Sequence, residues 1–287
     1  GFAYVSCPEF LKEGAALTDF LAPDRVVVGD DGDWAGDAVV DLYAPLDAPI
    51  VRTDVASAEM VKLAANAFLA TKISFINEIA IVCEETGADV LEVARGMGLD
   101  QRIGTHFLKP GIGFGGSCFP KDVSALKQLA GNSGYHFQLL TAVIEVNELQ
   151  KRRVVAKLQK HLGTLVGKRV ALLGLAFKAH TNDMREASSL VLSARMQADG
   201  ATVSAYDPIA EDEARKLMPG VRFADSALEA VQGADACVLV TEWPEFAQLD
   251  WAAVKARMAG CLLVDGRNFA DREAVVGAGF TYEGIGR

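Results

Sequence analysis

The sequence predicts an α/β protein in three parts. Short apolar runs near the amino terminus have the length of β-strands, which indicates part of a small sheet. Residues 54–165 change to a hydrophobic period of about 3.6, which is typical of helices, and residues 166–287 alternate strand and helix patterns. We therefore expect an incomplete α/β unit in residues 1–53, a central all-helical region, and a carboxyl-terminal parallel, doubly wound sheet.

Length, composition and charge exclude several classes of protein. The chain has 287 residues, 51% apolar and 23% charged, so it is long enough for about two domains and too apolar to be disordered. Its 28 basic and 38 acidic residues give a formal net charge of −10, whereas binders of nucleic acid or anionic membranes normally carry a basic excess. No run reaches the roughly 18 apolar residues of a membrane span, and the first residues lack the charged start of a signal peptide. Five widely spread cysteines without metal-type pairing predict a soluble protein of a reducing compartment, the cytoplasm.

Residues 1–53 have too few elements for a closed domain. Apolar residues at 3–6, 25–28 and 48–52 predict three strands, and residues 8–14 predict a short helix. Three strands and one helix cannot cover both faces of a sheet, so we expect these elements to belong to a larger domain.

A long helix is predicted for residues 57–85. Ser57 is the expected N-cap, and no glycine or proline follows until Gly87, which makes a natural carboxyl-terminal stop. At ~1.5 Å per residue the helix would be about 40 Å long. Its apolar residues lie nearly all round it, so it must be covered, and a second copy of the same helix is one economical cover. The sequence therefore predicts a homodimer formed through helix 57–85.

Shorter helices complete the central region. Residues 89–96, 122–129 and 138–161 have helical spacing, whereas residues 108–120 do not. The central region is thus expected to be helical except for one glycine-rich loop.

Residues 166–287 alternate strand and helix, which predicts parallel strands connected by helices. A helix is expected at 187–198, and the expected strands are 169–173, 202–206, 236–241, 261–264 and 280–283. Ligands of such sheets bind beyond the carboxyl ends of the strands, where Gly174, Asp207 and Thr241 are located. We expect a binding site at this edge.

The most informative stretch is segment 111–122, Gly-Ile-Gly-Phe-Gly-Gly-Ser-Cys-Phe-Pro-Lys-Asp. It formally matches the dinucleotide fingerprint G-x-G-x-x-G, but no strand precedes it and residues 118–120 separate it from the next helix, so the context does not fit. A loop that brings backbone close to a ligand fits better. Cys118 would then lie just ahead of Lys121 and of the positive end of the helix opening near Asp122, and both favour a reactive thiolate. The alternative is a small buried residue at a loop corner.

Lys62 and Asn66 are four residues apart and share one face of the long helix. A lysine within an apolar surface is costly unless it is paired or used, and an ammonium beside an amide forms a donor pair suited to a developing oxyanion. The alternative is a lysine that reaches out to solvent and an amide that bonds a neighbouring helix. Asn77 and Glu78 lie too many turns away to join this site and are interpreted as interface or surface.

Glu9 and Glu13 are also four residues apart, around Phe10 and Leu11. Paired carboxylates in apolar surroundings suggest acid–base chemistry, and an ordinary solvated start of a helix is the alternative. The four histidines show no metal-ligand spacing, so no metal site is predicted.

Five short segments, in order along the chain, combine the residues discussed above. They are residues 8–14 (Pro-Glu-Phe-Leu-Lys-Glu-Gly), 59–68 (with Glu59, Lys62 and Asn66), 115–122 (Gly-Gly-Ser-Cys-Phe-Pro-Lys-Asp), 174–178 (Gly-Leu-Ala-Phe-Lys) and 265–268 (Asp-Gly-Arg-Asn). Together they resemble the UDP-glucose/GDP-mannose dehydrogenase family of nucleotide-sugar dehydrogenases. The third and fifth segments, with Trp243, favour the UDP-glucose branch, and the GDP-mannose branch, which shares the mechanism, is the alternative.

The resemblance implies a two-step, NAD-dependent oxidation of UDP-glucose to UDP-glucuronate. It implies that Cys118 adds to the intermediate aldehyde as a thiohemiacetal, and that a thioester then forms and is hydrolysed. Lys62 and Asn66 would stabilise the oxyanion. Asp122 would position water or help to take protons, and Glu9 would act as general acid or base.

The same resemblance implies two sets of contact residues. The residues expected to bind substrate are Glu9, Phe10, Leu11, Lys12, Glu13, Lys62, Asn66, Arg102 (from the other subunit), Lys109, Pro110, Gly111, Ile112, Gly113, Phe114, Gly115, Phe177, Lys178 and Arg267. The residues expected to bind NAD are Glu13, Cys118, Lys121 and Arg185. The implied partners are UDP-glucose and a second copy of the chain, with no nucleic acid, membrane or metal.

The chain departs from the family pattern in three ways. Cys7 stands where Asn is usual before Pro-Glu-Phe, and Asn182 replaces the commoner Asp. The family's first Rossmann unit would precede residue 1, so residues 1–53 are expected to be the end of an NAD-binding Rossmann domain. The central dimerisation domain would then be 54–165 and the UDP-sugar-binding Rossmann-like domain 166–287. Either the chain is part of a complete dehydrogenase, or as given it is a catalytically silent UDP-sugar-binding dimer module.

Overall fold

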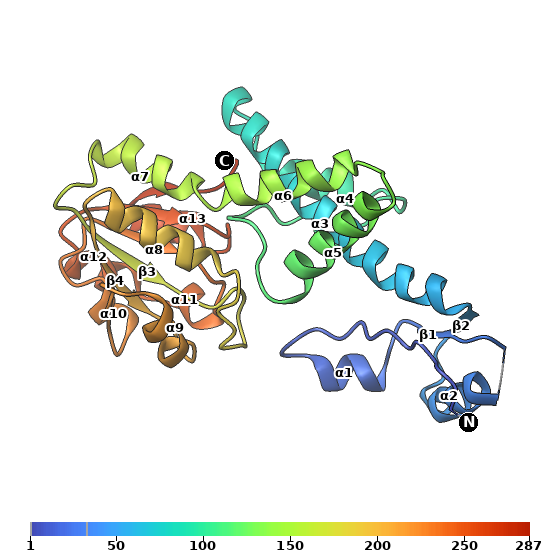
Figure 1. Cartoon of the computed structure of the whole chain (residues 1–287). Helices are drawn as coiled ribbons and strands as arrows, with labels where there is room; N and C mark the ends of the chain where they lie inside the picture. The colour runs from blue at the N-terminus through green and yellow to red at the C-terminus, as the bar shows by residue number, and fades with distance from the viewer. Residues whose placement is uncertain (1, 33) are drawn as a thin grey trace.

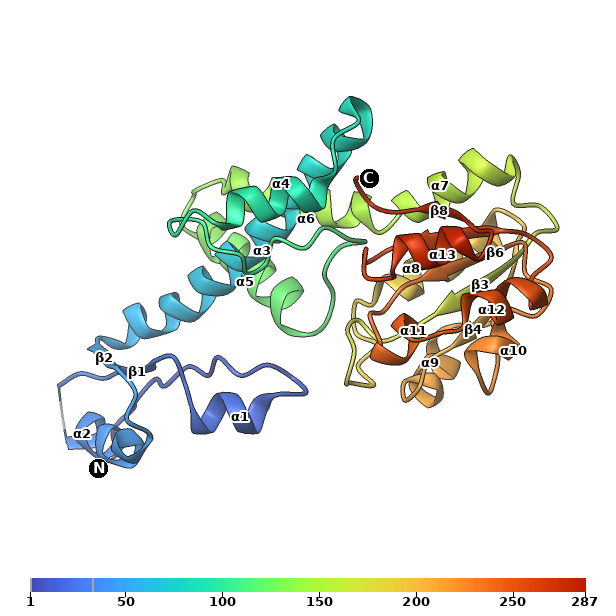
Figure 2. The same ribbon diagram turned by 180° about the vertical axis from the view of Figure 1, so that it is seen from behind.

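The computed structural model describes residues 2–32 and 34–287; Gly1 and Asp33, both within the expected segment 1–53, lie outside the described residues. Three regions follow one another along the chain (Figure 1). A small two-stranded unit lies at the start of the long helix α3 (Val55–Thr86), shorter helices pack along α3, and a six-stranded parallel sheet follows. From behind, α3 again runs from the small unit towards the carboxyl terminus (Figure 2). The predicted fold class is confirmed.

The amino-terminal unit is less regular than predicted. Its parallel strands and helices are β1 (Val26–Gly29), β2 (Ile50–Thr53), α1 (Ala16–Leu21), α2 (Trp34–Tyr43) and the 3-10 helix η1 (Ala44–Leu46). The predicted strand at 3–6 is wrong, because Ser6 forms only an isolated antiparallel bridge with Gly29. The predicted helix at 8–14 is also wrong. Glu13 is hydrogen-bonded to Lys178 and Thr181 of the carboxyl-terminal domain, and Gly14 has φ +80°, which is not a helical conformation, before α1 begins.

Helix α3 confirms the longest predicted element and corrects its start. The N-cap is Asp54, not Ser57, and the Asp54 carboxylate accepts the Ser57 N–H at 2.8 Å. Gly87 ends the helix in the left-handed conformation, as predicted. Among the described helices, α3 alone is long and apolar enough to span a membrane, with a mean hydropathy of 1.3 over one 18-residue window. In the structure 44% of that window is buried, and α3 packs against α5 and α6.

The other central helices are α4 (Val90–Gly98), α5 (Cys118–Asn132), α6 (Gln138–Gln150) and α7 (Arg153–Leu162). Helix α5 begins at Cys118 rather than at residue 122, since Pro120 lies in the first turn, where a missing N–H leaves no partner unsatisfied. The single helix predicted for 138–161 is two helices. The break lets α6 pack on α3 while α7 packs on the sheet domain.

The carboxyl-terminal domain is a parallel sheet of strand order β5-β4-β3-β6-β7-β8. Its elements are β3 (Arg169–Leu173), α8 (Ser188–Ala198), β4 (Thr202–Tyr206), α9 (Glu211–Leu217), β5 (Arg222–Phe223), α10 (Ala227–Ala230), β6 (Ala236–Leu239), α11 (Pro244–Ala247), α12 (Trp251–Arg257), β7 (Leu262–Asp265), α13 (Arg272–Gly277) and β8 (Thr281–Glu283). Alternate residues of β3 enter different cores. Val170 and Leu172 face α7 and α8, whereas Ala171 and Leu173 face α10 to α12. The short strand β5 and helices α9 to α13 were not predicted.

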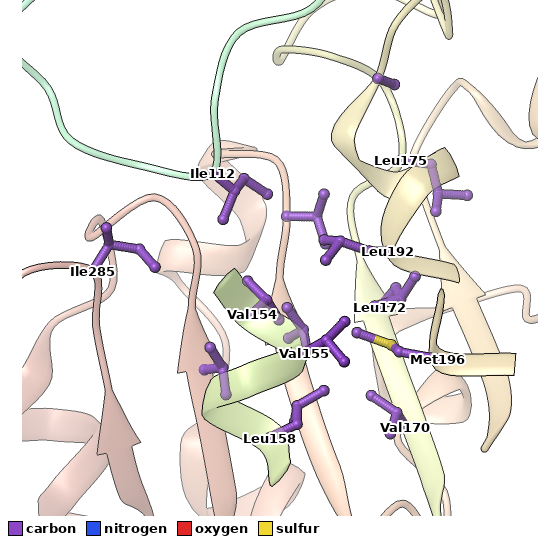
Figure 3. Close-up of a cluster of buried hydrophobic side chains, with 14 of the residues drawn as sticks. Ile112, Val154, Val155, Leu158, Val170, Leu172, Leu175, Leu192, Met196 and Ile285 are labelled. Carbon is purple, nitrogen blue, oxygen red and sulfur yellow. The ribbon is translucent and has the colours of Figure 1, made fainter. Parts of the chain in front are cut away.

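Two residues from outside the sheet complete the larger core. Ile112 of the glycine-rich loop and Ile285 near the carboxyl terminus are fully buried with Val154, Leu192 and other residues of α7, β3 and α8 (Figure 3). The loop is thus attached by its side chain to the sheet domain.

A buried charge cluster joins the carboxyl-terminal strand β8 to the helices. Lys157 is 6% exposed and contacts Glu84 at 2.7 Å and Glu283 at 2.9 Å, while His161 Nε2 lies 2.7 Å from Glu283. Burial raises the pKa of Glu283, but hydrogen bonds from Lys157 and His161 outweigh it, so the pKa lies below its ordinary value of 4.5.

A pH dependence of stability follows from this lowered pKa. The Glu283 carboxylate contributes stability that is fully present above the unfolded-state value and is lost as the pH falls through the folded value. We expect Glu283→Gln to flatten the decline of the melting temperature below about pH 4.5. Glu213→Gln, at an exposed ion pair of α9, is the control and should keep the wild-type profile. An unchanged acid decline in Glu283→Gln would contradict the expected role of the cluster.

Candidate active site

A cavity of about 440 Å³ lies where the three regions meet. Ten of the predicted site residues line it: Phe10, Leu11, Lys12, Glu13, Lys62, Asn66, Gly115, Cys118, Phe177 and Lys178. They come from the amino-terminal segment, helix α3, the start of α5 and the turn after β3. The described residues therefore bring Cys118, Lys62 and Asn66, three of the five expected catalytic residues, to one cavity.

Cys118 is the first residue of α5 and is exposed towards this cavity. The preceding Gly116 N–H donates to the carbonyl of Arg185 at 2.8 Å, which fixes the loop just before the helix. A thiol at a helix amino terminus faces unpaired N–H groups, which stabilise negative charge on sulfur. Exposure and position both suit a nucleophile better than a packing residue.

Lys62 and Asn66 lie on the same wall of the cavity as predicted from their spacing. Asn66 is 7% exposed and donates from Nδ2 to Asp122 Oδ2 at 2.6 Å, which links α3 to α5 behind Cys118. Lys62 Nζ lies 3.5 Å from Glu9 Oε1 and 5.4 Å from the centre of the Phe10 ring. A positive group therefore stands at the cavity wall, with a carboxylate beside it.

Glu9 and Glu13 do not share a helical face, because residues 8–12 are not helical. The Glu9 carboxylate accepts the Leu11 N–H at 2.6 Å and meets Lys62, whereas Glu13 binds the sheet domain. Lys178 Nζ donates to the Glu13 carbonyl and Thr181 Oγ1 to its carboxylate, both at 2.5 Å. These bonds close the amino-terminal segment over the cavity.

The glycine-rich loop is held by protein groups along most of its length. Gly111 N–H donates to Asn77 Oδ1 at 2.8 Å, Phe114 exchanges two hydrogen bonds with Asn147, and Arg267 Nη1 donates to the Gly113 carbonyl at 3.0 Å. The expectation that the loop offers its backbone to a ligand stays a prediction, and only the end of the loop reaches the cavity. Of residues 109–115, Gly115 alone lines the 440 Å³ cavity.

Several predicted contact residues lie outside this cavity. Arg267 donates to carbonyls of Val240 and Gly113, and the Arg102 side chain is 88% exposed and pairs with Asp100. Within the described part of the chain, neither Arg267 nor Arg102 lines the 440 Å³ cavity. Asp122 and Glu9 do not line the cavity themselves, but each contacts a residue that does. Asp122 accepts a hydrogen bond from Asn66, and Glu9 pairs with Lys62.

Lys121 and Arg185 line a second cavity of about 820 Å³ that shares Gly116 and Ser117 with the first. Their side chains are 74% and 64% exposed, so both cations can meet an anionic ligand, although Arg185 is also held by Asp183 at 2.8 Å. Exposed cations close to Cys118 fit the phosphates of a dinucleotide. The residues that this chain supplies are therefore compatible with NAD. Among the described residues, no group of three His, Cys, Asp or Glu side chains could hold a metal.

The polar residues at the strand ends hold turns in place. Asp207 accepts four backbone N–H groups and the Trp243 Nε1–H, and Thr241 donates to the Ala176 carbonyl at 2.6 Å. Burial raises the pKa of Asp265, whose carboxylate accepts the N–H groups of Arg267 and Ala270. These bonds shape the turn that carries Phe177 and Lys178.

Several residues of the site were missed or misread from the sequence, Arg25, Phe107 and Asn77 among them. Arg25 and Phe107 line the 440 Å³ cavity, and the Arg25 guanidinium lies 3.6 Å from the centre of the Phe10 ring. No spacing in the sequence links Arg25 to Phe10. Asn77 is fully buried and holds Gly111, so its interpretation as interface or surface is wrong. The sequence did offer a signal for this role. An asparagine on a helix that is apolar on all sides is expected to be buried, and a buried amide needs hydrogen-bond partners.

Comparison with known proteins decides the family. Residues 1–47 match the NAD-binding domain, 56–149 the central domain and 171–272 the UDP-binding domain of the UDP-glucose/GDP-mannose dehydrogenase family. UDP-glucose 6-dehydrogenase TuaD of Bacillus subtilis is 48% identical over 287 residues, which is 100% of this chain and 62% of the relative. The UDP-glucose 6-dehydrogenase of Rickettsia conorii is 40% identical over 292 residues, covering 100% of this chain and 68% of the relative. The chain belongs to this family.

Solved structures agree with this assignment to the UDP-glucose/GDP-mannose dehydrogenase family. A UDP-glucose dehydrogenase from Pyrobaculum islandicum matches with a TM-score of 0.91 and 38% identity, over 99% of this chain and 64% of that one. A UDP-D-ManNAc dehydrogenase from Pyrococcus horikoshii matches with a TM-score of 0.85 and 30% identity, over 100% and 65%. The chain spans 62% to 68% of the length of the curated relatives named here, and only part of the NAD-binding domain is present. The match to that domain confirms the expected NAD cofactor.

Proposed function

We propose that this chain supplies the nucleophile and the sugar-nucleotide site of a UDP-glucose 6-dehydrogenase. The observation that carries the proposal is the placement of Cys118, at the start of α5, in one cavity with Lys62 and the Phe177-Lys178 pair. The same cavity meets the segment Phe10–Glu13, so an alcohol carbon placed beside the sulfur would be enclosed on three sides. The names of the relatives support the substrate.

Each of these residues is assigned a role in the two oxidations of UDP-glucose. Lys121 and Arg185 would hold NAD beside the second cavity, and NAD would supply the hydride acceptor for both oxidations. Between the two oxidations, Cys118 sulfur bonds to the carbonyl carbon of the C6 aldehyde, and the carbonyl oxygen gains negative charge that the Lys62 ammonium stabilises. After the second oxidation the carbon–sulfur bond is that of a thioester. Water adds to the thioester carbon, and the carbon–sulfur bond breaks with the Cys118 thiolate as the leaving group. The acid is released as its carboxylate, and its protons pass through Glu9 to solvent.

Proton handling falls to the two carboxylates next to these groups. Asp122 is 4% exposed and bonded to Asn66, so it can hold the amide in position and orient water at the thioester carbon. Glu9 touches Lys62 and lies at the entrance, where it can pass protons to solvent. We assign the general acid and base role to Glu9 and the water-positioning role to Asp122.

UDP-glucose is favoured over GDP-mannose as the substrate. The GDP-mannose dehydrogenase structure from Pseudomonas aeruginosa matches with a TM-score of 0.53 at 29% identity, against 0.91 at 38% for the UDP-glucose enzyme. Titration calorimetry of the chain with UDP-glucose and with GDP-mannose tests this preference. Binding of GDP-mannose alone would overturn it.

Turnover tests the proposed reaction. We expect this chain alone to bind UDP-glucose without reducing NAD, because residues 1–47 match only part of the NAD-binding domain. A chimaera that joins the chain to the amino-terminal portion of the Bacillus subtilis relative should form NADH and UDP-glucuronate. A chimaera that binds UDP-glucose but forms no product would reject the dehydrogenase function, and turnover by the chain alone would reject the silent-module alternative.

A homodimer through α3 is the expected assembly. Val61, Phe68, Phe75 and Val82 repeat every seven residues along α3 and are 36% to 66% exposed. Such a stripe is typical of a helix that pairs with another helix. We therefore propose that two copies of the chain pair by burying this stripe. We also propose that the protein is cytoplasmic and that its domains are residues 1–53, 54–165 and 166–287.

Charge placed in the stripe should prevent pairing. We expect Phe68→Glu to convert a dimer into a monomer, because an unpaired carboxylate would be buried in the contact. Sedimentation velocity measures the change, with Leu217→Glu on the exposed surface of α9 as the matched control. A Phe68→Glu protein that sediments like wild type would rule out this surface as the contact.

A further inference from the structure

We propose that the last turn of α6 is a clamp that positions the nucleophile loop. The α6 clamp consists of Asn147 and Gln150 with Lys151, the residue that ends the helix, and the nucleophile loop is residues 111–117. None of the three lines the 440 Å³ cavity that holds Cys118, and only Asn147 lines the 820 Å³ cavity, so Gln150 and Lys151 can act only as positioning residues. The inference rests on the proposed role of Cys118, the residue that directly follows the loop.

Asn147 and Gln150 hold the loop by its backbone. Asn147 Oδ1 accepts the Phe114 N–H at 2.8 Å and its Nδ2 donates to the Phe114 carbonyl at 3.0 Å. Gln150 Nε2 donates to the Gly111 carbonyl at 2.7 Å. Both side chains are at least nine-tenths buried, with exposures of 4% and 1%. Buried amides of this kind are costly to leave unpaired, so these bonds fix the loop against α6.

Lys151 holds the loop at its other end, through Glu186. The Lys151 side chain is 2% exposed, and its ammonium contacts Glu148 at 2.7 Å and Glu186 at 3.3 Å. Glu186 has φ +52°, a conformation that a non-glycine residue keeps only when its surroundings hold it. Its carbonyl lies where a Cβ on Gly115 would have to go. Lys151 thus secures the surface on which Gly115 rests, three residues before Cys118.

The clamp works against a second set of anchors on the sheet domain. Ser188 Oγ donates to the Ile112 carbonyl at 2.9 Å, and the Ile112 side chain enters the core between α7 and α8 (Figure 3). Arg267 donates to the Gly113 carbonyl. With α6 on one side and the sheet on the other, the loop has one position. That position sets where Cys118 stands relative to Lys62, on α3.

Hydrogen exchange tests the clamp on this chain, without substrate. We expect Gln150→Met and Lys151→Met to raise the exchange of the Phe114 and Gly116 amides by about tenfold, since both amides are held by bonds that the clamp supports. Two controls match the clamp variants. Ser74→Ala removes a buried hydrogen bond from α3 to the Val143 carbonyl of α6. Lys157→Met removes from α7 a lysine that is also buried, with a side-chain exposure of 7%, and paired with two carboxylates. Neither control contacts the loop, so loop exchange should stay at its wild-type rate.

A second readout separates positioning from general stability. Alkylation by iodoacetamide, resolved by peptide, compares Cys118 with the exposed Cys261 of the sheet domain in the same molecule. We expect the ratio of the Cys118 rate to the Cys261 rate to change about threefold in the clamp variants, because the loop sets how far Cys118, the first residue of α5, is exposed. Unchanged exchange and ratio in both clamp variants would overturn the proposal, as would equal changes in the controls. Neither readout needs turnover, so a failed clamp and a failed dehydrogenase assignment give different results.

Discussion

Replacing Cys118 by serine is expected to abolish UDP-glucuronate formation in the chimaera, with a loss of at least about 10³-fold in rate. The physical reason is that a serine hydroxyl is a poorer nucleophile at neutral pH and its ester would be a different intermediate. Cys118 is the first residue of α5 and is exposed towards the cavity, so a hydroxyl in its place would meet the same carbon with a weaker nucleophile. The measurement is product formation, followed by chromatography.

Cys261→Ser is the matched control for this change. Cys261 is also exposed but lies at the edge of the sheet domain, with its sulfur 3.9 Å from Thr281 Oγ1. It should leave turnover and UDP-glucose binding at wild-type values. If Cys118→Ser formed as much product as wild type, the thioester route would be rejected. The proposed binding site would not be contradicted by that result.

Lys62→Met is expected to lower turnover by about 10²-fold or more while UDP-glucose still binds. The ammonium is largely withdrawn from solvent, with a side-chain exposure of 17%, and Phe10 and Glu9 surround it. A positive charge in such a place stabilises a developing oxyanion more than the same charge in water. The effect should therefore appear in kcat, because the oxyanion is absent from the bound alcohol.

Lys72→Met serves as the control on the same helix. Its Nζ donates to the carbonyl of Ile103 at 2.9 Å, and Lys72 does not line the 440 Å³ cavity. Wild-type turnover is expected for this variant. If Lys62→Met instead raised KM with kcat unchanged, Lys62 would be a substrate contact and not the oxyanion group.

Elements with strong local patterns were predicted to within a few residues. Strands Arg169–Leu173 and Thr202–Tyr206 were placed without error. The first is a nearly continuous apolar run, the second alternates buried with less buried residues, and Gly174 and Pro208 mark where they end. The long helix was found from its uninterrupted spacing. Its N-cap was misplaced because Asp54 and Ser57 both suit an N-cap, and local sequence does not rank them.

Elements whose limits depend on distant contacts were not predicted. The start of α5 at Cys118 is set by the loop that Arg185 and Asn147 hold, and the break after α6 follows from packing on two different regions. The irregular segment 8–14 reflects bonds from Lys178 and Thr181 to Glu13. These partners are far away in the chain, so no window of neighbouring residues contains them.

Local spacing and residue type were sufficient to identify Cys118, Lys62 and Asn66 as groups able to do chemistry, and the alternation of strands and helices was sufficient for the parallel sheet. Only the tertiary structure shows which of those groups lie close to one another. Asn66 reaches Asp122, 56 residues later, and Lys178 reaches Glu13 across 165 residues. Such encounters arise from burial of apolar surface over the whole molecule, a sum of many weak and non-directional contacts that no short motif records.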